Sequence, residues 1–399
     1  MPPTTTSPSP ERLLMLMAVT ATLCFATWQA LLNNFAIESA AFTGAEIGTL
    51  QSLREIPGFL AFTAIFLLLI LKEQQLALFA LATMAMGVAA TGLLPTTYGL
   101  YATTLVMSIG FHYYETVQSS LTLQWLPKEQ TARFMGRVIG AKAAASLATF
   151  ATIWVLFELL AIDYLWVYLL AGGASLLLVL YLRWHYPYFT QPALQHRHML
   201  LRRRYWLYYA LTFMSGARRQ IFIVFAGFLM VEKFGYSVAS ISLLFLVNQS
   251  LNLFLGPRIG RLIHRLGERR SLMIEYAGLI GVFSGYALVD DGDLAAALYV
   301  VDHLFFVMAI AMKTYFQKIA DPQEIASTAG VSFTINHIAA VIIPVLFGFI
   351  WLQSPATVFL CGALMAMVSL LLSLNIPHQP APGNEVIFGK SSRTVATTL

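Results

Sequence analysis

Residues 183–204 of the chain read RWHYPYFTQPALQHRHMLLRRR and form the longest hydrophilic interruption in an otherwise apolar sequence. On either side, apolar stretches follow one another at the length of about 20 residues that a helix needs to cross roughly 30 Å of hydrocarbon. The sequence is 58% hydrophobic and 11% charged, with a mean hydropathy of +0.71, a balance that a soluble domain could not solvate. These features predict a polytopic membrane protein.

Twelve apolar stretches have membrane length, and the segment 183–204 divides them into six and six. Both sets have similar lengths and spacing, which indicates an internal duplication offset by roughly 190 residues. The predicted fold is all-α, with twelve transmembrane helices in two pseudo-symmetric six-helix bundles. The predicted spans are 12–36, 46–71, 75–93, 97–122, 132–158, 162–182, 205–231, 237–256, 271–289, 294–313, 325–350 and 355–375.

Each bundle forms a predicted domain, 12–182 for the N-terminal one and 205–375 for the C-terminal one, joined by the basic cytoplasmic linker 183–204. Residues 1–11 are rich in Pro, Ser and Thr, lack the features of a cleaved signal peptide, and are expected to be disordered. Residues 376–399 form a polar tail that we expect to be flexible and cytoplasmic.

Lysine and arginine residues fall mainly on the segments that would be cytoplasmic if the N-terminus lies inside. Since cytoplasmic loops of membrane proteins carry the excess of basic residues, both termini are expected in the cytoplasm. The short loops fit a multi-pass protein of a bacterial inner, cytoplasmic membrane. The net charge of +5 follows from this topology and from attraction to anionic lipid headgroups, so nucleic-acid binding is discounted.

A second short stretch, residues 260–269, reads GRLIHRLGER. Together with the two six-helix halves and the basic central loop, it resembles the major facilitator superfamily of secondary transporters, whose loop signature is G-x-L-x-D-R-x-G-R-R. The match holds at glycines and arginines, while His264 replaces the acidic residue of the signature. The corresponding loop of the first half, 71–75, lacks the pattern. The resemblance implies a gating loop formed by Gly260, Arg261, His264, Arg265, Gly267 and Arg269.

The resemblance also implies that the third, sixth, ninth and twelfth spans lie outside a central cavity lined by the others. Mid-span ionisable residues follow this division, with Asp163 and Glu275 at the ends of their spans. Because a charge in hydrocarbon costs several kcal/mol, such residues indicate a solute or proton pathway. The mid-span ionisable residues are Arg54, Glu55, His112, Glu115, Lys142, Arg218, Arg219, Asp302, His303 and His337.

His112, Glu115 and Ser119 are spaced three and four apart in the fourth span, so they share one face of a helix. Because burial and a nearby cation shift a carboxyl pKa in opposite directions, Glu115 is the first candidate for a proton-carrying residue. The alternative is a permanent ion pair with a neighbouring basic helix. A shift of 187 residues places Asp302 and His303 at nearly the same point of the second half, and only one of them is expected to face the cavity. The predicted proton-coupling residues are Glu115, Asp302, His112, His303 and Glu55.

Two adjacent arginines of the seventh span, Arg218 and Arg219, can bind a carboxylate or phosphate group bidentately and favour an anionic substrate. Alternatively, one arginine pairs with Asp302 and the other caps a broken helix or extends to the membrane interface. Lone amides and histidines in spans are commonly structural, through hydrogen bonds between helices. The predicted substrate-binding residues are Arg54, Arg218, Arg219, Gln29, Asn33, Asn248, Asn252, Asn336 and His337.

Arg54 and Glu55 precede Pro57 in the second span, and Pro57 removes a backbone donor. We therefore expect a kink near these charges. Arg54 is a candidate for substrate binding, but it alternatively only neutralises Glu55 or Glu115.

Cys24 and Cys361 lie in unrelated apolar spans and indicate neither a disulfide, a metal pair nor a catalytic dyad. No zinc-binding spacing, phosphate-binding glycine loop or nucleophile elbow stands out in the sequence. We therefore expect no cofactor, no metal site and no catalytic residue. The expected partners are a small-molecule substrate, protons and the lipid bilayer, and the protein is expected to be a monomer.

These inferences predict a secondary active transporter that moves a small anionic or zwitterionic organic solute across the cytoplasmic membrane by alternating access, coupled to protons. An alternative on the same fold is an exporter of amphipathic or cationic drugs or lipids. A non-transporting membrane sensor also stays open because the first-half loop lacks the signature. A membrane-embedded transferase that uses His112, Glu115, Asp302 or His303 as acid or base is disfavoured, because no nucleophile–base motif is visible.

Overall fold

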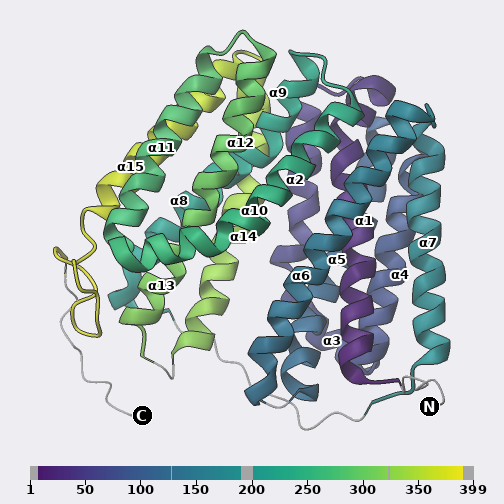
Figure 1. Ribbon diagram of the computed structural model, residues 1–399, viewed down its shortest axis with the longest axis horizontal. Coiled ribbons are helices and arrows are strands. Elements are labelled where there is room, and N and C mark those ends of the chain that lie inside the picture. The colour runs from purple at the N-terminus through teal and green to yellow at the C-terminus, as the bar shows by residue number, and fades with distance from the viewer. Residues whose placement is uncertain (1–7, 127, 190–200, 322–323, 390–399) are drawn as a thin grey trace. The chain divides into compact units, whose positions relative to one another are not determined.

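The computed structural model describes residues 8–126, 128–189, 201–321 and 324–389 (Figure 1). Within these residues the chain is almost entirely helical and contains no β-strand. The predicted disordered N-terminus, basic linker and flexible tail lie partly outside the described residues, at 1–7, 190–200 and 390–399.

The helices of the first half follow the predicted spans to within a few residues. Side chains that cap the helix starts help to fix these bounds, since Ser9 accepts a hydrogen bond from the Arg12 backbone nitrogen and Thr96 accepts one from that of Gly99. The helices are α1 (Pro10–Ala40), α2 (Gly44–Phe59), α3 (Ala64–Leu68), α4 (Glu73–Thr91), α5 (Thr97–Trp125), α6 (Lys128–Trp154) and α7 (Tyr164–His185).

The second half repeats this pattern of long helices, with one predicted span interrupted by the π-helical turn Phe222–Ala226 and another divided at Ala309. Single π-helical turns often mark functional positions because they locally change the helical register. The helices are α8 (Trp206–Ile221), α9 (Gly227–Glu232), α10 (Val238–Leu266), α11 (Glu268–Leu288), α12 (Gly292–Met308), α13 (Ile310–Ile319), α14 (Ile325–Trp351) and α15 (Pro355–Ser373).

The predicted span 46–71 is interrupted where the sequence predicts a kink. Helix α2 ends at Phe59, two residues after Pro57, and a 3-10 turn at Ala61–Thr63 leads into the short α3. The proline ring cannot donate the backbone hydrogen bond that a continuous helix would need.

Ten helical stretches in the described residues are long and apolar enough to cross a membrane. The predicted spans 46–71 and 97–122 are not among these ten. The first is divided after Pro57, and the second, α5, carries polar side chains such as His112 and Glu115 that lower its hydropathy. The protein is therefore a multi-pass membrane protein, and the full number of twelve spans stays a prediction.

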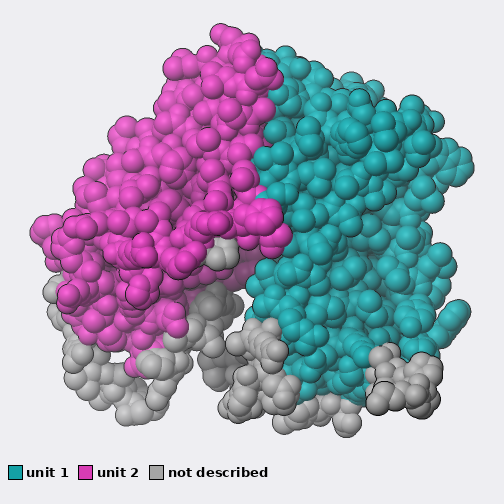
Figure 2. Space-filling model, viewed as in Figure 1, with its two compact units in different colours: residues 1–195, 227–250 teal, residues 196–226, 251–399 magenta. Residues whose placement is uncertain are grey.

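The chain forms two compact units, shown in different colours in Figure 2. Unit 1 comprises residues 1–195 and 227–250, and unit 2 comprises residues 196–226 and 251–399. Within unit 1, α4 packs against α5 and α7. The contact with α5 is close, because a Cβ added to Gly87 of α4 would lie 2.5 Å from the backbone nitrogen of Met107 on α5. Within unit 2, α11 packs against α15 and α8 against α14. The predicted domains 12–182 and 205–375 remain a prediction.

Residues 376–389, the first part of the predicted flexible tail, follow a defined path along unit 2. The Tyr315 hydroxyl of α13 donates to the Glu385 carbonyl oxygen at 2.7 Å, and the Ile387 nitrogen donates to the Asn375 carbonyl oxygen at 3.0 Å. The side chain of Val386 is buried.

Candidate proton and substrate sites

Arg54 and Glu55 form a buried ion pair on α2 in unit 1. Their side chains are 10% and 11% exposed, and an Arg54 guanidinium nitrogen donates to a Glu55 carboxylate oxygen. The guanidinium carbon lies 5.7 Å from the ring centroid of Trp28 on α1, and the Ser108 hydroxyl of α5 donates to the Arg54 carbonyl oxygen. Two neighbouring helices therefore hold an arginine whose charge Glu55 balances.

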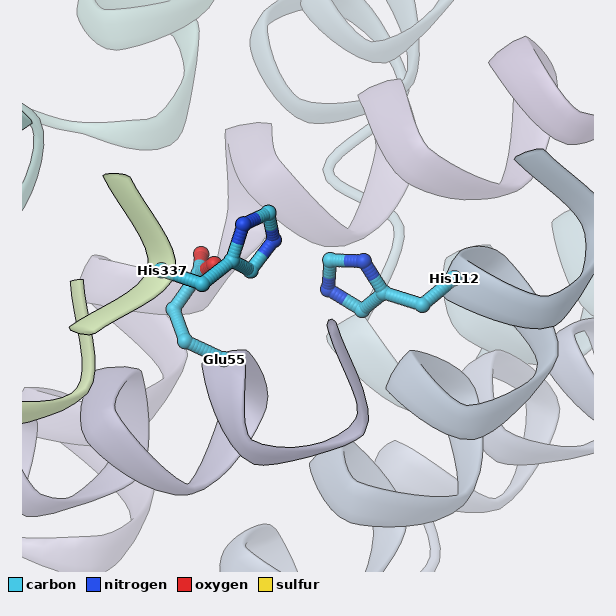
Figure 3. A group of neighbouring side chains, drawn as sticks. All are labelled: Glu55, His112 and His337. Carbon is cyan, nitrogen blue, oxygen red and sulfur yellow. The ribbon is translucent and has the colours of Figure 1, made fainter. Parts of the chain in front are cut away.

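His112 of α5 is a third ionisable residue of this region. The side chain is buried, and its nearer ring nitrogen and a carboxylate oxygen of Glu55 lie within 4.8 Å of each other. Figure 3 shows the two side chains extending from α2 and α5 into the same part of unit 1. The fold thus brings together two of the predicted proton-coupling residues, which stand far apart in the sequence.

Glu115, the first predicted proton carrier, forms an ion pair with Lys142 of α6. The Lys142 ammonium nitrogen lies 2.9 Å from Glu115 Oε1, with side chains that are 33% and 40% exposed for Lys142 and Glu115. This is the arrangement that the alternative interpretation describes, an ion pair with a neighbouring basic helix. The pair is therefore less enclosed by protein than the pair of Arg54 and Glu55.

Three charged side chains are buried together in unit 2, where they come from α8, α11 and α12. Arg218, Glu275 and Asp302 are 3%, 2% and 3% exposed. Arg218 Nη2 lies 3.8 Å from Glu275 Oε1, and its guanidinium carbon lies 4.6 Å from the ring centroid of Tyr276. Asp302 lies on α12, whose Phe306 and Tyr299 contact Arg219 and Phe222, the residues of the chain that follow Arg218. Arg218, predicted to bind substrate, therefore lies against a protein carboxylate, that of Glu275.

Sequence reasoning undervalued Glu275, which it placed at the end of a span. The residue lies within α11 and is buried against Arg218, a contact that depends on how α8 packs. The only signal in the sequence was the presence of a carboxylate inside a membrane-length helix.

Adjacent residues on α12 and on α8 differ in their surroundings. Asp302 is buried, whereas His303 is half-buried with its ring centroid 5.7 Å from those of Phe222 and Tyr299. Arg219 is exposed, and its guanidinium carbon lies 5.1 Å from the ring centroid of Phe306. Neighbours on a helix point about 100° apart, which explains why Arg218 is buried while Arg219 is exposed.

Gln29 and Asn33 lie half-buried on α1 of unit 1. Asn33 Nδ2 would lie 2.9 Å from a Cβ added to Gly227. The next residue, Asn34, is buried and donates to the Tyr236 carbonyl oxygen at 2.7 Å, a contact that sequence reasoning missed. Amides of α1 therefore serve both packing and hydrogen bonding within unit 1.

The remaining predicted polar residues divide into two groups. Asn248 is buried with neither amide atom hydrogen-bonded among the described residues, and the Asn252 amide oxygen also lacks a partner there. Such groups are available to water or a polar solute. Asn336 on α14 packs against Gly216 of α8, and His337 Nδ1 lies 2.9 Å from the Phe333 carbonyl oxygen, an arrangement typical of structural residues.

The predicted gating loop lies where α10 meets α11. Gly267, between the two helices, has a φ of +78°, and Arg269 Nη1 lies 3.2 Å from His378 Nε2. His264 is exposed, as are Arg261 and Arg265, which line a surface cavity of about 400 Å³. The surroundings of Gly260 lie outside the described part of the chain.

Glu324, which precedes α14, contacts three side chains from the segment that precedes α8. Glu324 Oε1 lies 2.8 Å from Arg202 Nε, and Glu324 Oε2 accepts from Arg204 and from the Tyr205 hydroxyl at 2.5 and 2.8 Å. Partial burial opposes ionisation, but the hydrogen bonds and the nearby arginine charges outweigh it and hold the pKa of Glu324 below its ordinary value.

A family model described as Major Facilitator Superfamily matches residues 13–344. The chain belongs to this superfamily. The resemblance inferred from the loop 260–269 and from the two halves is thereby confirmed.

Solved transporters share the fold of this superfamily member. A variant of the nucleoside transporter NupG aligns with a TM-score of 0.75 at 17% identity, covering 92% of this chain and 99% of that chain. A bacterial homolog of the human lysosomal transporter Spinster, inward-facing and occupied, gives 0.69 at 12% identity, covering 91% and 95%. A POT family transporter in complex with 5-aminolevulinic acid gives 0.71 at 12% identity, covering 92% and 95%. A comparison of the sequence with curated proteins finds no match.

Proposed function

We propose that this superfamily member is a proton-coupled secondary transporter that moves a small anionic or zwitterionic organic solute by alternating access. The family and the fold support transport across a membrane. The observation that carries proton coupling is Asp302, a carboxyl group that is 3% exposed within the membrane-length stretch Gly292–Ile319 and forms no ion pair among the described residues.

The protonation state of a carboxyl group in such surroundings depends on whether the group is buried or in contact with water. The ionised form is costly in a low-dielectric interior, so the buried group favours the protonated form, whereas contact with water or a cation favours loss of the proton. A conformational change that alternately opens and buries Asp302 would therefore take up a proton on one side and release it on the other. Glu115 and the Glu55–His112 pair are further proton-coupling residues of the proposal, and His303 lies beside Asp302.

Arg219 is the proposed partner of the solute's negative charge. Arg219 is exposed, and its guanidinium carbon lies 5.1 Å from the ring centroid of Phe306. A guanidinium group keeps its charge at every physiological pH and can bind a carboxylate bidentately. As separate proposals from the sequence, Gln29, Asn33, Asn248 and Asn252 are solute-contacting amides.

Proton flux in proteoliposomes tests the proposal. Vesicles with an internal pH dye would be exposed to pooled organic anions, amino acids, nucleosides and cationic drugs. Solute-dependent flux is expected for the wild type and lost in Asp302→Asn, while Asp293→Asn, an exposed position in the first turn of the same helix, should keep it. Flux that survives in Asp302→Asn would overturn the proton role, and flux driven only by cations would overturn the anionic substrate.

The orientation and assembly of the chain complete the proposal. We place both termini on the cytoplasmic side of an inner membrane, because basic residues gather on the linker and on the loop 260–269. We also propose a monomer with the domain boundaries predicted from the sequence. Labelling of single cysteines from either side of right-side-out vesicles tests the orientation, and labelling of position 264 from outside would reverse it.

A further inference from the structure

The buried cluster of unit 2 contains more negative than positive charge when fully ionised. Arg218, Glu275 and Asp302 are all at least nine-tenths buried, and a guanidinium group cannot lose its proton at any pH that a protein survives. Two carboxylates and one guanidinium would leave a net charge of −1 in the interior. An unbalanced buried charge is so costly that one carboxyl group takes up a proton instead.

The other basic side chains of the packed helices are exposed rather than buried with the cluster, or pair with another residue. Arg219 lies over Phe306, and Lys318 of α13 pairs with Glu268 at 2.7 Å. Lys313 of α13 is exposed, and α15 contributes no charged residue. The remaining titratable groups on α8, α11, α12 and α14 that lie in or near this region are Tyr276, Tyr286, Tyr299, His303 and His337.

The ion pair within the cluster leaves bonding capacity unused. Arg218 approaches Glu275 at 3.8 Å through one nitrogen, whereas a forked contact would use two. Glu275 Oε2 and Arg218 Nη1 are buried and have no hydrogen-bond partner among the described residues. The guanidinium group is therefore not saturated by Glu275, and Arg218 Nη1 keeps a donor for another buried acceptor.

We infer that Glu275 is a second proton-holding residue of unit 2, and that Glu275 and Asp302 share one proton while Arg218 neutralises whichever carboxylate is ionised. The proton moves between a carboxylate oxygen and water, and no other bond changes. This inference rests on the proposed role of Asp302 and adds Glu275, which lies on a helix that the family resemblance places outside the cavity. The shared proton belongs to the pair, so its titration cannot be assigned to one residue.

Infrared spectroscopy of the purified full-length protein tests the inference through the carbonyl stretch of a protonated carboxyl group, followed from acid to alkaline pH. The wild type should show a titrating band that either Glu275→Gln or Asp302→Asn removes, because each variant leaves one carboxylate to pair with Arg218. Asp293→Asn should keep the band. Glu275→Asp, which keeps the carboxyl group but shortens the side chain, should keep the band with a shifted midpoint.

The outcomes separate this inference from the proposed function. A band lost in Asp302→Asn but unchanged in both Glu275→Gln and Glu275→Asp would assign the proton to Asp302 alone and overturn the sharing. A band that persists in Asp302→Asn would overturn the sharing by giving Glu275 its own proton. If the bands behave as expected but wild-type proteoliposomes show no proton flux with any solute, the shared proton stands and proton-coupled transport fails. Size-exclusion chromatography would confirm that each variant is folded.

Discussion

At the scale of single residues, exposure decides what each ion pair contributes. Arg54 and Glu55 have side chains that are 10% and 11% exposed, whereas Lys142 and Glu115 are 33% and 40% exposed. Removing one partner of a buried pair leaves an unbalanced charge in the interior. A pair that water reaches loses little, because water solvates the charge that remains.

The buried pair of α2 should therefore behave as a coupled unit. Arg54→Met or Glu55→Gln alone is expected to lower the free energy of unfolding by about 3–5 kcal/mol, since each leaves one buried charge uncompensated. The double variant Arg54→Met/Glu55→Leu should recover part of this loss. Thermal unfolding of the wild type, the two single variants and the double variant in detergent measures the coupling between the two residues. If the two single losses of stability simply add up in the double variant, the ion pair would be contradicted.

The exposed pair should separate stability from function. The proposed proton role of Glu115 requires water to reach this pair, so Glu115→Gln and Lys142→Gln are each expected to change the free energy of unfolding by no more than about 1 kcal/mol. If Glu115 carries protons, only Glu115→Gln should also abolish solute-dependent proton flux. A loss of stability as large as that of Glu55→Gln would instead identify a structural ion pair.

Acid should weaken the contact at Glu324. The pKa of this group is lowered in the folded state, so its ion pairs contribute stability above the ordinary pKa of glutamate, about 4.3, and lose it as the pH falls through the folded value. Thermal unfolding of the wild type and Glu324→Gln should therefore differ at neutral pH and converge in acid. A difference independent of pH would contradict the assigned contacts with Arg202 and Arg204.

At the scale of elements, the apolar pattern predicted the positions of the helices well. It predicted the interruptions within the helices less well. The span predicted at 12–36 is the helix Pro10–Ala40, because its apolar length and its cap are local properties of the sequence. The break after Pro57 also has a local cause. The π-helical turn Phe222–Ala226 contains no proline or other local signal of an interruption, and a single sequence does not predict how the helices around it pack.

The connection between α10 and α11 requires a glycine. Gly267 combines a φ of +78° with a ψ of 164°, a conformation that other residues adopt only at a cost of about 1–3 kcal/mol. Gly267→Ala should therefore destabilise unit 2 by that amount in thermal unfolding. Gly281→Ala, within α11 and with no atom within 4 Å of an added Cβ, should instead be neutral or slightly stabilising. Equal effects of the two substitutions would contradict the assigned backbone conformation.

At the scale of the whole molecule, architecture was predictable and the chemistry of the sites only in part. Composition, span length and the central loop indicated two halves of a known superfamily, and transporters at 12–17% identity share the fold. The predicted site list included Asp302 and Arg218 because charge within a span is visible in the sequence. It gave Glu275 no role and missed Asn34, because their burial and partners depend on helices that are remote in the sequence.

The central claim is that a proton gradient drives solute movement through this protein. The most direct measurement is the accumulation of a transported solute in proteoliposomes under an imposed pH gradient, with and without a protonophore. We predict accumulation against the solute gradient that collapses when the protonophore is added and is absent in Asp302→Asn. Accumulation unaffected by the protonophore, or equal in Asp302→Asn and the wild type, would contradict the proton-coupled mechanism.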